Sequence, residues 1–513
     1  MILDFFKRRA RRLDRREPTF SGRSYAAAGG GRLTADWIAS TSSGDSELHG
    51  SLAILRNRSR SLCRDNAYAK RARNVIKLNL VGTGIRMQSI RTDQNGQKRR
   101  EENESLQNAW WRWANGDGCH VAGILSLQDI LRLAVGEVFE AGEVILRMVP
   151  ERFGSSEVPL AIEVIEAERL VNSTRIEKLP NGNSIRMGVE CDEWGRPVAY
   201  WLYRGHPGDG VFRGYNAQDH IRVPAEDCIH LYVCDRWPQT RGEPWMATSI
   251  RRLRDVDKYT ESELVAARAS ASIMGFIQRP DDEAYGGDDE EDEENVFHGR
   301  PGEIWKLDPG ETFNGFNPSR PNTGLEPFLR YMIREIATGV GISYEALSRD
   351  YSKSNYSSSR LSIIDDRQAF RVLQWWLIQR FLYPLYRRWF RAASLAGVVM
   401  VHGAFSEENE WVEAVRFQPP GWQWIDPTKE IAAYVAAVNA GFMTVSDVIA
   451  QTGGDPEDTF KARQAELELM KELGIESHPI SADAPPPQLE ATGGEGSGDP
   501  PPDEDQETQT IEQ

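Results

Sequence analysis

Apolar residues recur at helical spacing through the first third of the chain. Leu48, Leu52 and Leu55 form one row, and a second row runs through residues 69–80. Spacings of three and four residues place apolar side chains on one face of a helix, so both rows predict amphipathic helices. The run VGTG at 81–84 is expected to end the second helix.

The hydrophobic pattern changes to that of strands at residue 143. Short runs of β-branched and aromatic residues, bounded by Pro, Gly and Asn, are typical of strands. Such runs occur at Glu143–Val149, Ala161–Ile165, Ile185–Glu190, Val198–Tyr203 and Cys228–Val233. The residues DEWG at 192–195 are expected to form a short turn between two of these strands. Helices together with clustered strands predict an α+β body.

Long amphipathic helices are predicted in the second half of the chain. Residues 249–275 keep one face apolar, and a second such helix is expected at 325–342 after an irregular stretch rich in Pro and Gly. A polar loop at 343–359 precedes a long apolar-rich helix at 360–395. Pro384 lacks the amide for one helical hydrogen bond and is expected to kink this last helix.

The charge of the chain is distributed unevenly. The 513 residues carry 61 Lys and Arg against 77 Asp and Glu, a formal charge of −16. Ten acids and no base lie at 281–294, and the same holds at 476–513, so the remaining chain has 57 acids against 61 bases. Residues 1–16 carry seven bases, and residues 17–45 are rich in Gly, Ser and Ala, as in flexible arms. The overall acidity therefore does not exclude a nucleic-acid partner.

Cysteine usage and hydropathy restrict the class of protein. No run of about 18 apolar residues occurs, so no membrane-spanning helix is predicted. The five cysteines form no CxxC pair, which favours reduced intracellular thiols. Cys228 and Cys234 lack a histidine at metal-ligand spacing and are expected to be buried thiols. His230 lies within an apolar strand and is expected to be a hydrogen-bonded core residue.

The sequence contains few signals of catalysis. The motifs GxxxxGK[ST], HExxH and GxSxG are absent, which argues against the P-loop, zinc-protease and hydrolase sites that they mark. Glu137, Glu140 and Glu143 could form the metal cluster of a nuclease, but their spacing at a helix-to-strand junction fits a solvated edge better. We therefore assign no catalytic, cofactor-binding or metal-binding residue.

The polar loop at 343–359 contains basic and aromatic residues close together. Arg349, Lys353 and Arg360 lie among Tyr351 and Tyr356. This combination suits weak, sequence-independent contact with a phosphate backbone. An ordinary surface loop explains the same composition equally well.

Several longer segments are more specific in combination than any single motif. They are DNAYAKRARNVIKLNLVGTGIRMQ (65–88), WWRWANGDGC (110–119), VIEAERL (164–170), MGVECDEWGRPVAYWLYRGHPGD (187–209), RVPAEDCIHLYVCDRWPQTRGEPWM (222–246), RRLRDVDKYTESELVAARASASIMGFI (251–277) and NYSSSR (355–360). In this order they resemble the lambda family of bacteriophage portal proteins. The resemblance covers most of residues 50–425.

The resemblance implies a portal-like fold with an α+β wing, long stem helices, a small clip insertion and a helical C-terminal crown. The corresponding segments are a basic and then Gly/Ser-rich arm (1–45), a wing-like domain (46–248), a stem helix (249–275), a clip-like insertion with the acidic loop 281–294 (276–324), a second stem helix (325–342), a tunnel-type loop (343–359), a long kinked helix (360–395), a wing return (396–427), a crown of two or three helices (428–475) and an acidic tail expected to be disordered (476–513).

The resemblance also implies a function and a set of partners. A portal subunit forms a homo-oligomeric ring, usually a dodecamer, at one vertex of the capsid, and double-stranded DNA passes through it non-specifically during packaging and ejection. The implied partners are the terminase, the major capsid and scaffold proteins and the head–tail connector proteins. The implied location is the virion, and the host cytoplasm during assembly. Neither a cofactor, an enzymatic activity nor a membrane contact is implied.

Moving DNA limits how strongly such a channel can bind phosphates. Each phosphate neutralised by a cation adds ~0.9 to the salt slope of binding, so strong basic contacts repeated around a ring would hold the DNA back. We therefore expect Arg349, Lys353 and Arg360 to touch DNA transiently.

Two other classes of protein compete with the portal interpretation. One is a metal-dependent nuclease or maturation protease of the phage head, which would require carboxylates or a Ser/His pair converging in a cleft. The other is a minor head or adaptor protein, against which the predicted helix–insertion–helix arrangement argues.

Overall fold

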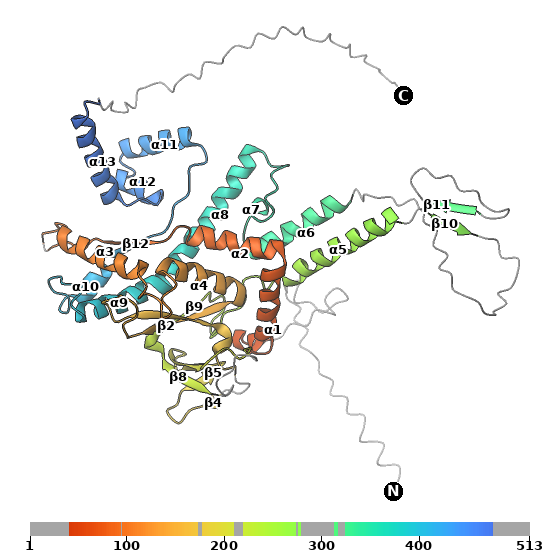
Figure 1. Ribbon diagram of the computed structural model, residues 1–513, viewed down its shortest axis with the longest axis horizontal. Coiled ribbons are helices and arrows are strands. Elements are labelled where there is room, and N and C mark those ends of the chain that lie inside the picture. The colour runs from red at the N-terminus through yellow and green to blue at the C-terminus, as the bar shows by residue number, and fades with distance from the viewer. Residues whose placement is uncertain are drawn as a thin grey trace, which may run out of the picture. The chain divides into compact units, whose positions relative to one another are not determined.

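The computed structural model divides the chain into two compact units, Met1–Phe417 and Gln418–Gln513 (Figure 1). The structure describes residues 41–93, 95–172, 177–209, 219–272, 275–278, 312–315 and 324–475. The first unit combines helices with antiparallel sheets and is α+β, as predicted. Among the described residues, no helix has the length and apolar character that a bilayer span requires.

Four helices cover the N-terminal part of the first unit. They are α1 (Gly44–Asp65), α2 (Ala67–Leu80), α3 (Arg100–Asn115) and α4 (Leu127–Ala141). Asn66 separates α1 from α2 and caps α2 by accepting a hydrogen bond from the Ala69 N–H at 2.9 Å. Ser126 and Asp129 form a capping box at the start of α4, and Gly142 ends that helix in the left-handed region.

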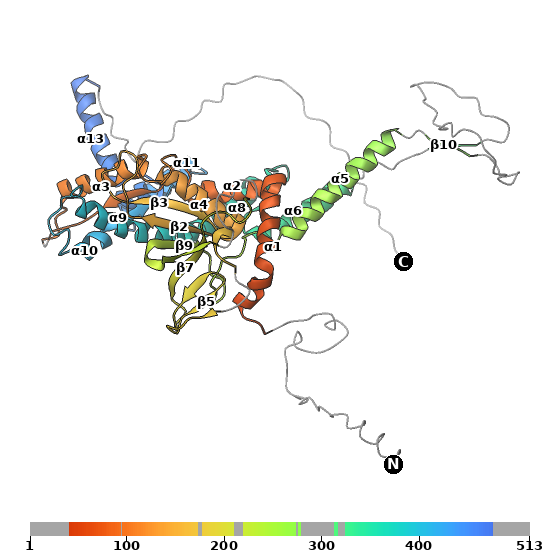
Figure 2. The same cartoon turned by 60° about the horizontal axis from the view of Figure 1, so that its bottom comes forward.

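A three-stranded antiparallel sheet lies beneath α4 (Figures 1 and 2). Its central strand β2 (Glu143–Val149) pairs with β3 (Ala161–Glu166) on one side and β9 (Cys228–Tyr232) on the other. The central strand is buried on both faces, which explains its continuous apolar run. Ile145 packs in one cluster with Leu202 of the neighbouring five-stranded sheet, so a hydrophobic core lies between the two sheets.

The five-stranded sheet is an antiparallel meander. Its strands, in order, are β4 (Glu177–Lys178), β5 (Ser184–Arg186), β6 (Val189–Cys191), β7 (Pro197–Tyr203) and β8 (His220–Pro224). The prediction of one strand at Ile185–Glu190 is wrong, because Met187 (φ 46°) and Gly188 (φ 87°) turn the chain into a β5–β6 hairpin. The predicted turn at 192–195 is confirmed between β6 and β7.

Helices α5 (Ile250–Ser272) and α6 (Leu325–Val340) pack side by side (Figures 1 and 2). The rings of Tyr259 and Phe328 meet edge to face with centroids 5.1 Å apart. Two short strands, β10 (Gly275–Gln278) and β11 (Thr312–Gly315), pair antiparallel in the sequence between these helices. The acidic run 281–294 lies outside the described residues.

The long helix of the second half is continuous but not uniform. Helix α8 (Tyr356–Leu377) passes through a π-helical turn (Ile378–Leu382) into α9 (Tyr383–Leu395). The π-helical turn ends two residues before Pro384, which cannot donate the hydrogen bond that an α-helix needs at this position. The predicted disturbance at Pro384 therefore takes the form of a widened turn.

An aromatic core joins α3, α9 and the C-terminal strand of the first unit. Trp110 of α3 meets Trp389 of α9 at a centroid distance of 5.0 Å and an interplanar angle of 89°. Phe417 belongs to β12 (Val415–Gln418), and its ring centroid lies 6.1 Å from that of Trp110. Strand β12 follows α10 (Glu408–Glu413) and pairs with β1 (Arg86–Ser89). Edge-to-face contacts of this kind add stability beyond apolar burial.

The cysteine prediction is half right. Cys228 is buried, and burial raises the pKa of its thiol to about 12. Cys234 is exposed, so its predicted burial is wrong. Strand β9 ends at Tyr232, and the chain then leaves the sheet in an exposed turn that includes Cys234.

The described part of the second unit contains three helices, within the predicted two or three. They are α11 (Pro427–Asn439), α12 (Val445–Gln451) and α13 (Pro456–Glu472), and each begins at a side-chain cap. None of the three helices contains a buried residue. The predicted disordered tail 476–513 and the predicted flexible arm, up to residue 40, lie outside the described residues.

Candidate nucleic-acid interface

The polar segment between α6 and α8 is held by a few specific hydrogen bonds. Ser343 caps the short helix α7 (Tyr344–Ser348) by accepting from the Ala346 N–H at 3.3 Å. Asp366 of α8 in turn accepts from the Ser343 backbone at 2.9 Å and from its hydroxyl at 2.6 Å. Because Asp366 lies almost three turns into α8, these bonds fix α7 to the long helix.

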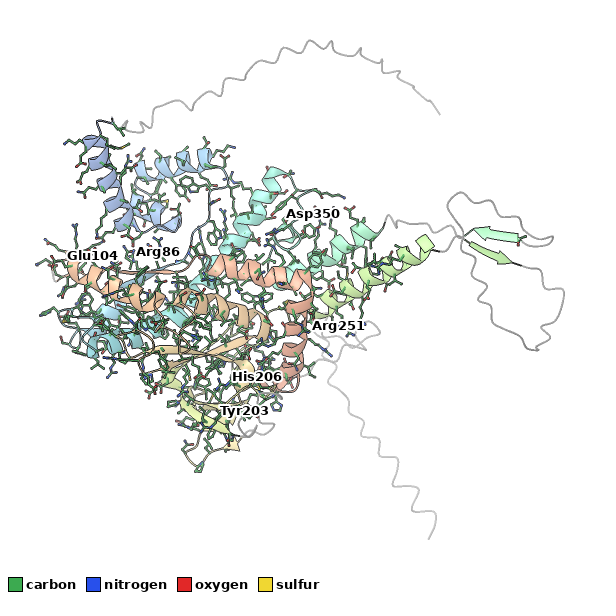
Figure 3. All side chains as sticks on the ribbon, viewed as in Figure 1. Arg86, Glu104, Tyr203, His206, Arg251 and Asp350 are labelled. Carbon is green, nitrogen blue, oxygen red and sulfur yellow. The ribbon has the colours of Figure 1, made fainter. Side chains whose placement is uncertain are left out.

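Asp350 organises the turn that follows α7 (Figure 3). It accepts hydrogen bonds from the hydroxyl groups of Ser352 at 2.6 Å and Tyr344 at 2.8 Å, and the Arg330 guanidinium lies 3.4 Å away. The bonds from Ser352 and Tyr344 lower the pKa of Asp350 to about 2. This carboxylate therefore stays ionised and shapes the turn.

The structure shortens the predicted loop at both ends. The segment at 343–359 contains α7 and the first turn of α8, because Asn355 and Ser358 form a capping box that starts α8 at Tyr356. The irregular part is thus confined to residues 349–355. Arg360 lies on α8 and not in the loop.

The three predicted basic residues differ in their surroundings. Arg349 ends α7 in a left-handed conformation (φ 57°) and is exposed, as is Lys353. Arg360 is half-buried. Within the part of the chain that the structure describes, no ion pair is formed by any of the three. Tyr351, which is 58% exposed, adds an aromatic surface between the two loop cations.

Arg71 of α2 is a fourth cation at this place, and sequence analysis missed it. Its Nε donates to the Ala346 carbonyl of α7 at 3.0 Å. Burial lowers the pKa of Arg71, and the nearby positive charge of Arg349 lowers it further. The two guanidinium groups are more than 270 residues apart in sequence, so only the packing of α2 on α7 brings them together.

Glu137, Glu140 and Glu143 form neither a metal cluster nor a solvated edge. Arg60 of α1 lies 2.9 Å from Glu137 and 3.5 Å from Glu140, and Arg73 of α2 also pairs with Glu140. The prediction of a solvated edge is wrong, because α1 and α2 cover this end of α4 with arginines. These carboxylates hold the helical layer together.

Glu143 is fully buried at the start of β2. Arg56, Arg241 and His230 all lie within 3 Å of its carboxylate, and the Gly242 N–H donates to it at 2.9 Å. Burial alone would raise the pKa of Glu143, but the Arg241 charge, the His230 hydrogen bond and the Arg56 charge outweigh it and hold the pKa well below its ordinary value. The prediction that His230 is a hydrogen-bonded core residue is confirmed.

One group of described residues has the composition of a metal site. Carboxylates of Glu166 and Glu168 lie near the imidazole of His206, which is labelled in Figure 3. The Arg60 guanidinium lies 2.7 Å from Glu168 and 3.9 Å from Glu166, so both carboxylates already face an arginine. The group is explained as an extension of the arginine–glutamate network.

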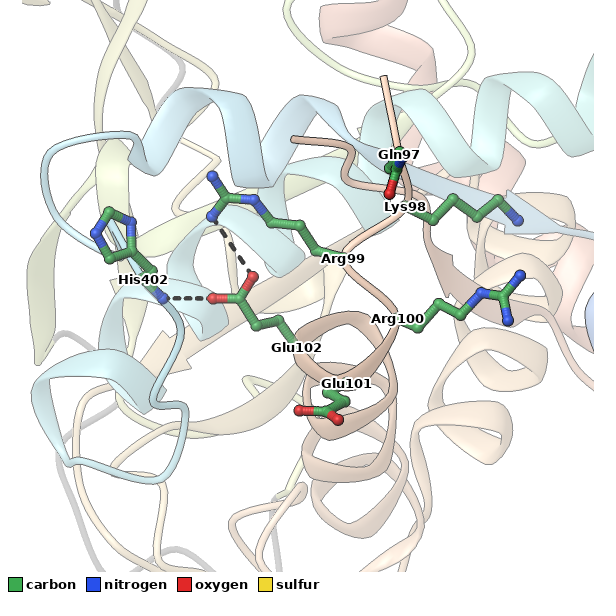
Figure 4. A pocket seen from close by; sticks show the side chains of 7 residues that line it. All are labelled: Gln97, Lys98, Arg99, Arg100, Glu101, Glu102 and His402. Carbon is green, nitrogen blue, oxygen red and sulfur yellow. Dashed lines mark hydrogen bonds and ion pairs between the residues drawn. The ribbon is translucent and has the colours of Figure 1, made fainter. Parts of the chain in front are cut away.

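An open hollow of about 880 Å³ lies at the start of α3 (Figure 4). Its lining combines three bases and two acids with an amide and an imidazole: Lys98, Arg99, Arg100, Glu101, Glu102, Gln97 and His402. Glu102 accepts from the His402 backbone at 2.8 Å and faces the Arg99 guanidinium at 3.5 Å (Figure 4). The Arg99 guanidinium also lies 5.8 Å from the ring centroid of Trp411. These contacts join α3 to the chain around residue 402 and place no nucleophile beside a base.

Comparison with known proteins identifies relatives of the chain. Residues 30–374 match the family described as phage portal protein, lambda family. The probable portal protein of Halomonas phage phiHAP-1 is 30% identical over 475 residues, which cover 90% of this chain and 89% of the relative. The portal protein B of Escherichia phage lambda is 22% identical, over 89% of this chain and 91% of the relative.

A solved structure with some likeness is the neck of a native gene transfer agent particle computed with C12 symmetry. It has a TM-score of 0.43 and 15% identity, and the match covers 78% of this chain and 94% of that chain.

Proposed function

The chain belongs to the lambda family of phage portal proteins, and from this we propose that its copies form a closed ring, expected to be a dodecamer, through which phage DNA is packaged and ejected. Portal proteins are structural components of the virion at the capsid vertex and are not enzymes. The observation that carries the proposal is the family match over residues 30–374 together with the relative that is 30% identical over most of both chains.

We assign the parts of a portal subunit to the elements of the fold as follows. Residues 46–248 with 396–427 form the wing, α5 and α6 the stem, the residues between these helices the clip, residues 343–359 the tunnel-type loop, and α11–α13 the crown. The packing of α5 on α6, with an ion pair of 2.8 Å between Arg252 and Glu335, supports a stem of two paired helices.

The proposed contact with DNA is made by the end of α7 and the turn after it. Arg349 and Lys353 are exposed and carry no ion pair with described residues, so their charges are available to phosphates. Asp350 does not compete for them, because its carboxylate is already engaged by Ser352, Tyr344 and Arg330.

Arg71 supports the same contact from α2, although its hydrogen bond to α7 restricts it to a positioning role. Two exposed cations per subunit on a short turn give contacts that are weak and reversible, as passage of DNA requires. Arg360, on the second turn of α8, would reach DNA only where the strand passes close to that helix.

The partners follow from the assignment to the family alone. They are the terminase during packaging, the major capsid and scaffold proteins during assembly in the host cytoplasm, and the head–tail connector proteins afterwards. The basic residues at 1–16 are proposed to contact a scaffold or capsid protein or DNA.

The ring is tested by measuring the mass of the purified full-length protein and imaging it by negative stain. A closed ring with a central hole is expected, and a monomer or dimer that cuts DNA with added metal would overturn the proposal. The DNA contact is tested by the triple substitution Arg349→Ala, Lys353→Ala and Arg360→Ala in phage particles. We expect normal rings and altered packaging or retention of DNA, with a difference that shrinks at high salt.

A matched control replaces three other bases, Arg100, Arg112 and Arg196, which are exposed on α3 and on the β6–β7 turn. If the loop variant and the control variant both package and retain DNA like the wild type, the proposed contact is wrong, whereas the ring proposal is unaffected.

A further inference from the structure

Two exposed tryptophans form an aromatic patch at one end of the five-stranded sheet. Trp194, in the turn between β6 and β7, is 81% exposed, and Trp237, in the segment after β9, is 71% exposed. A Cβ atom added to Gly195 would lie only 3.7 Å from the Trp237 ring, so this ring rests against the turn that carries Trp194. Single exposed apolar residues are common, but adjacent exposed indoles mark an interaction site.

Both tryptophans of the aromatic patch stand on backbone that hydrogen bonds hold in place. The Asp192 carboxylate accepts from the Trp194 N–H at 2.9 Å and fixes the β6–β7 turn. The side chain of the buried Gln239 accepts from the N–H of Arg236, the residue before Trp237, at 3.2 Å. The exposure of the two indoles is therefore a feature of the folded backbone and not of a loose turn.

The N-terminal arm joins the first unit beside the aromatic patch. The Arg236 guanidinium donates to the Ser42 carbonyl at 2.7 Å, and the Thr240 N–H donates to the Asp45 carboxylate at 2.8 Å. Helix α1 accordingly begins next to β5 in both views of the molecule (Figures 1 and 2). These contacts hold the first described residues against the segment that carries Trp237, so the arm starts next to the patch.

The arm carries apolar side chains within reach of the aromatic patch. In residues 26–41 the large apolar residues are Leu33, Trp37 and Ile38. Trp37 precedes Ser42 by five residues, and an extended chain covers ~3.3–3.6 Å per residue, so Trp37 can lie up to ~17 Å from Ser42. Because Ser42 contacts Arg236 and Trp237 follows Arg236 directly, the patch lies within this distance.

Other covering surfaces are less well placed than the arm. The segment 210–218 leaves the sheet after Tyr203 and returns at His220, whereas the turn with Trp194 precedes Pro197 at the opposite end of β7. A separate molecule would lose translational and rotational freedom on binding. A tethered segment, by contrast, meets the patch at an effective concentration in the millimolar range.

We propose that residues 33–39 of the arm dock on the aromatic patch of the same chain and cover Trp194 and Trp237. The contact requires one copy only, so it does not depend on the proposed ring. The docked arm leaves the first unit at residue 33 instead of residue 41. The basic residues 1–16 therefore extend from this end of the five-stranded sheet.

Hydrogen exchange of dissociated full-length subunits tests the docking from the side of the arm. The backbone amides of residues 33–39 are expected to exchange at least ~10-fold more slowly in the wild type than in the variant that combines Trp194→Ala with Trp237→Ala. Both side chains are exposed, so the variant retains the fold. Trp111→Ala is the matched control, because Trp111 of α3 is 66% exposed, and it is expected to leave the exchange of residues 33–39 unchanged.

Hydroxyl-radical footprinting of the same subunits tests the docking from the side of the patch. Trp194 and Trp237 are expected to be oxidised several-fold more slowly than Trp111, although both are more exposed than Trp111 without the arm. Combining Trp37→Asp with Ile38→Asp is expected to remove this protection. Combining Ala27→Asp with Ala28→Asp adds the same charge to the arm outside residues 33–39 and is expected to retain it.

The outcomes distinguish docking of the arm from other coverings of the patch. Fast exchange of residues 33–39, or fast oxidation of the two indoles, contradicts the inference. Slow oxidation that persists in the Trp37→Asp and Ile38→Asp variant shows that another surface covers the patch and also contradicts it. Protection that appears only in assembled rings assigns the patch to a neighbouring copy, so docking within one chain is wrong and the proposed ring stands. Failure to form rings overturns the proposed function but not this inference.

Discussion

Arg241 and Glu143 form an ion pair that is almost completely removed from solvent. The Arg241 Nη2 lies 2.6 Å from the Glu143 Oε1, and the two side chains are 2% and 0% exposed. The same guanidinium donates to the carbonyl oxygens of Met187 at 2.6 Å and Ala167 at 3.1 Å. One side chain therefore connects the central strand β2 with the β5–β6 turn and with the chain after β3.

Removing Arg241 is expected to destabilise the protein severely. Arg241→Met would leave the buried Glu143 carboxylate without its strongest partner, at a cost of ~3–5 kcal/mol in the free energy of unfolding. Arg252→Met is the control, because its ion pair with Glu335 is exposed and is expected to contribute ~0–1 kcal/mol. Urea denaturation of Arg241→Met and Arg252→Met measures the loss of stability in each variant. Equal losses in the two variants would contradict the role given to Arg241.

Glu190 is expected to make the stability of the five-stranded sheet sensitive to acid. The hydrogen bond from Arg222 lowers the pKa of Glu190 to about 2. Burial raises this pKa, and a further hydrogen bond from Asn183 lowers it. A carboxyl whose folded pKa lies below its unfolded value, about 4.3, contributes stability that is present above pH ~4 and lost toward pH ~2.

The denaturant midpoint of the wild type, measured between pH 6 and pH 2 in steps, should therefore fall below pH ~4. The Glu190→Gln variant cannot lose this charge, so its midpoint should start lower and fall less steeply. Parallel curves for the two proteins would show that Glu190 does not contribute to the acid sensitivity.

The Tyr386 hydroxyl is a polar group whose removal is expected to stabilise the protein. Its side chain is fully buried in the aromatic core, and its hydroxyl has no hydrogen-bond partner among the described residues. A buried polar group without a partner is destabilising, so Tyr386→Phe is expected to raise the free energy of unfolding by ~1 kcal/mol.

The comparison for Tyr386 is Trp113, in the same core. The Trp113 Nε1 donates to the Leu160 carbonyl at 2.9 Å, so Trp113→Phe removes a made hydrogen bond and should destabilise. Chemical unfolding of both variants tests the difference in sign. Destabilisation by Tyr386→Phe would mean that the hydroxyl is satisfied in solution.

Local sequence patterns predicted the elements of this fold well, because each pattern reports on neighbours along the chain. The strand Glu143–Val149 was predicted with its observed bounds, since an uninterrupted apolar run is what a doubly buried strand requires. The predicted strand at Ile185–Glu190 failed because the turn between β5 and β6 includes Met187, which seldom adopts a positive φ.

The partners of charged residues could not be predicted, because they come from distant parts of the chain. Glu143 meets Arg56, which is 87 residues away, and Arg241, which is 98 residues away. From the local sequence this glutamate was indistinguishable from one at a solvated edge. The same holds for Arg71, whose position beside Arg349 depends on how α2 packs on α7.

Gly142, between α4 and β2, should tolerate no side chain. Its backbone has φ +92°, and a Cβ atom there would lie 2.4 Å from the carbonyl carbon of Glu243 and 2.6 Å from the carbonyl oxygen of Gly242. Gly242 also donates its N–H to Glu143, so relief of the clash would disturb the buried ion pair. Gly142→Ala is therefore expected to cost ~3 kcal/mol or more in the free energy of unfolding, from backbone strain and overpacking together.

Gly341, at the end of α6, isolates the contribution of the backbone alone. It has φ +78°, similar to Gly142, but no heavy atom lies within 4 Å of where its Cβ would be. Gly341→Ala should cost only the ~1–2 kcal/mol of a left-handed alanine. Urea unfolding of the two variants gives the difference between them, which measures the steric part at Gly142. If both variants lose the same stability, the close approach of residues 242–243 to Gly142 does not constrain the fold.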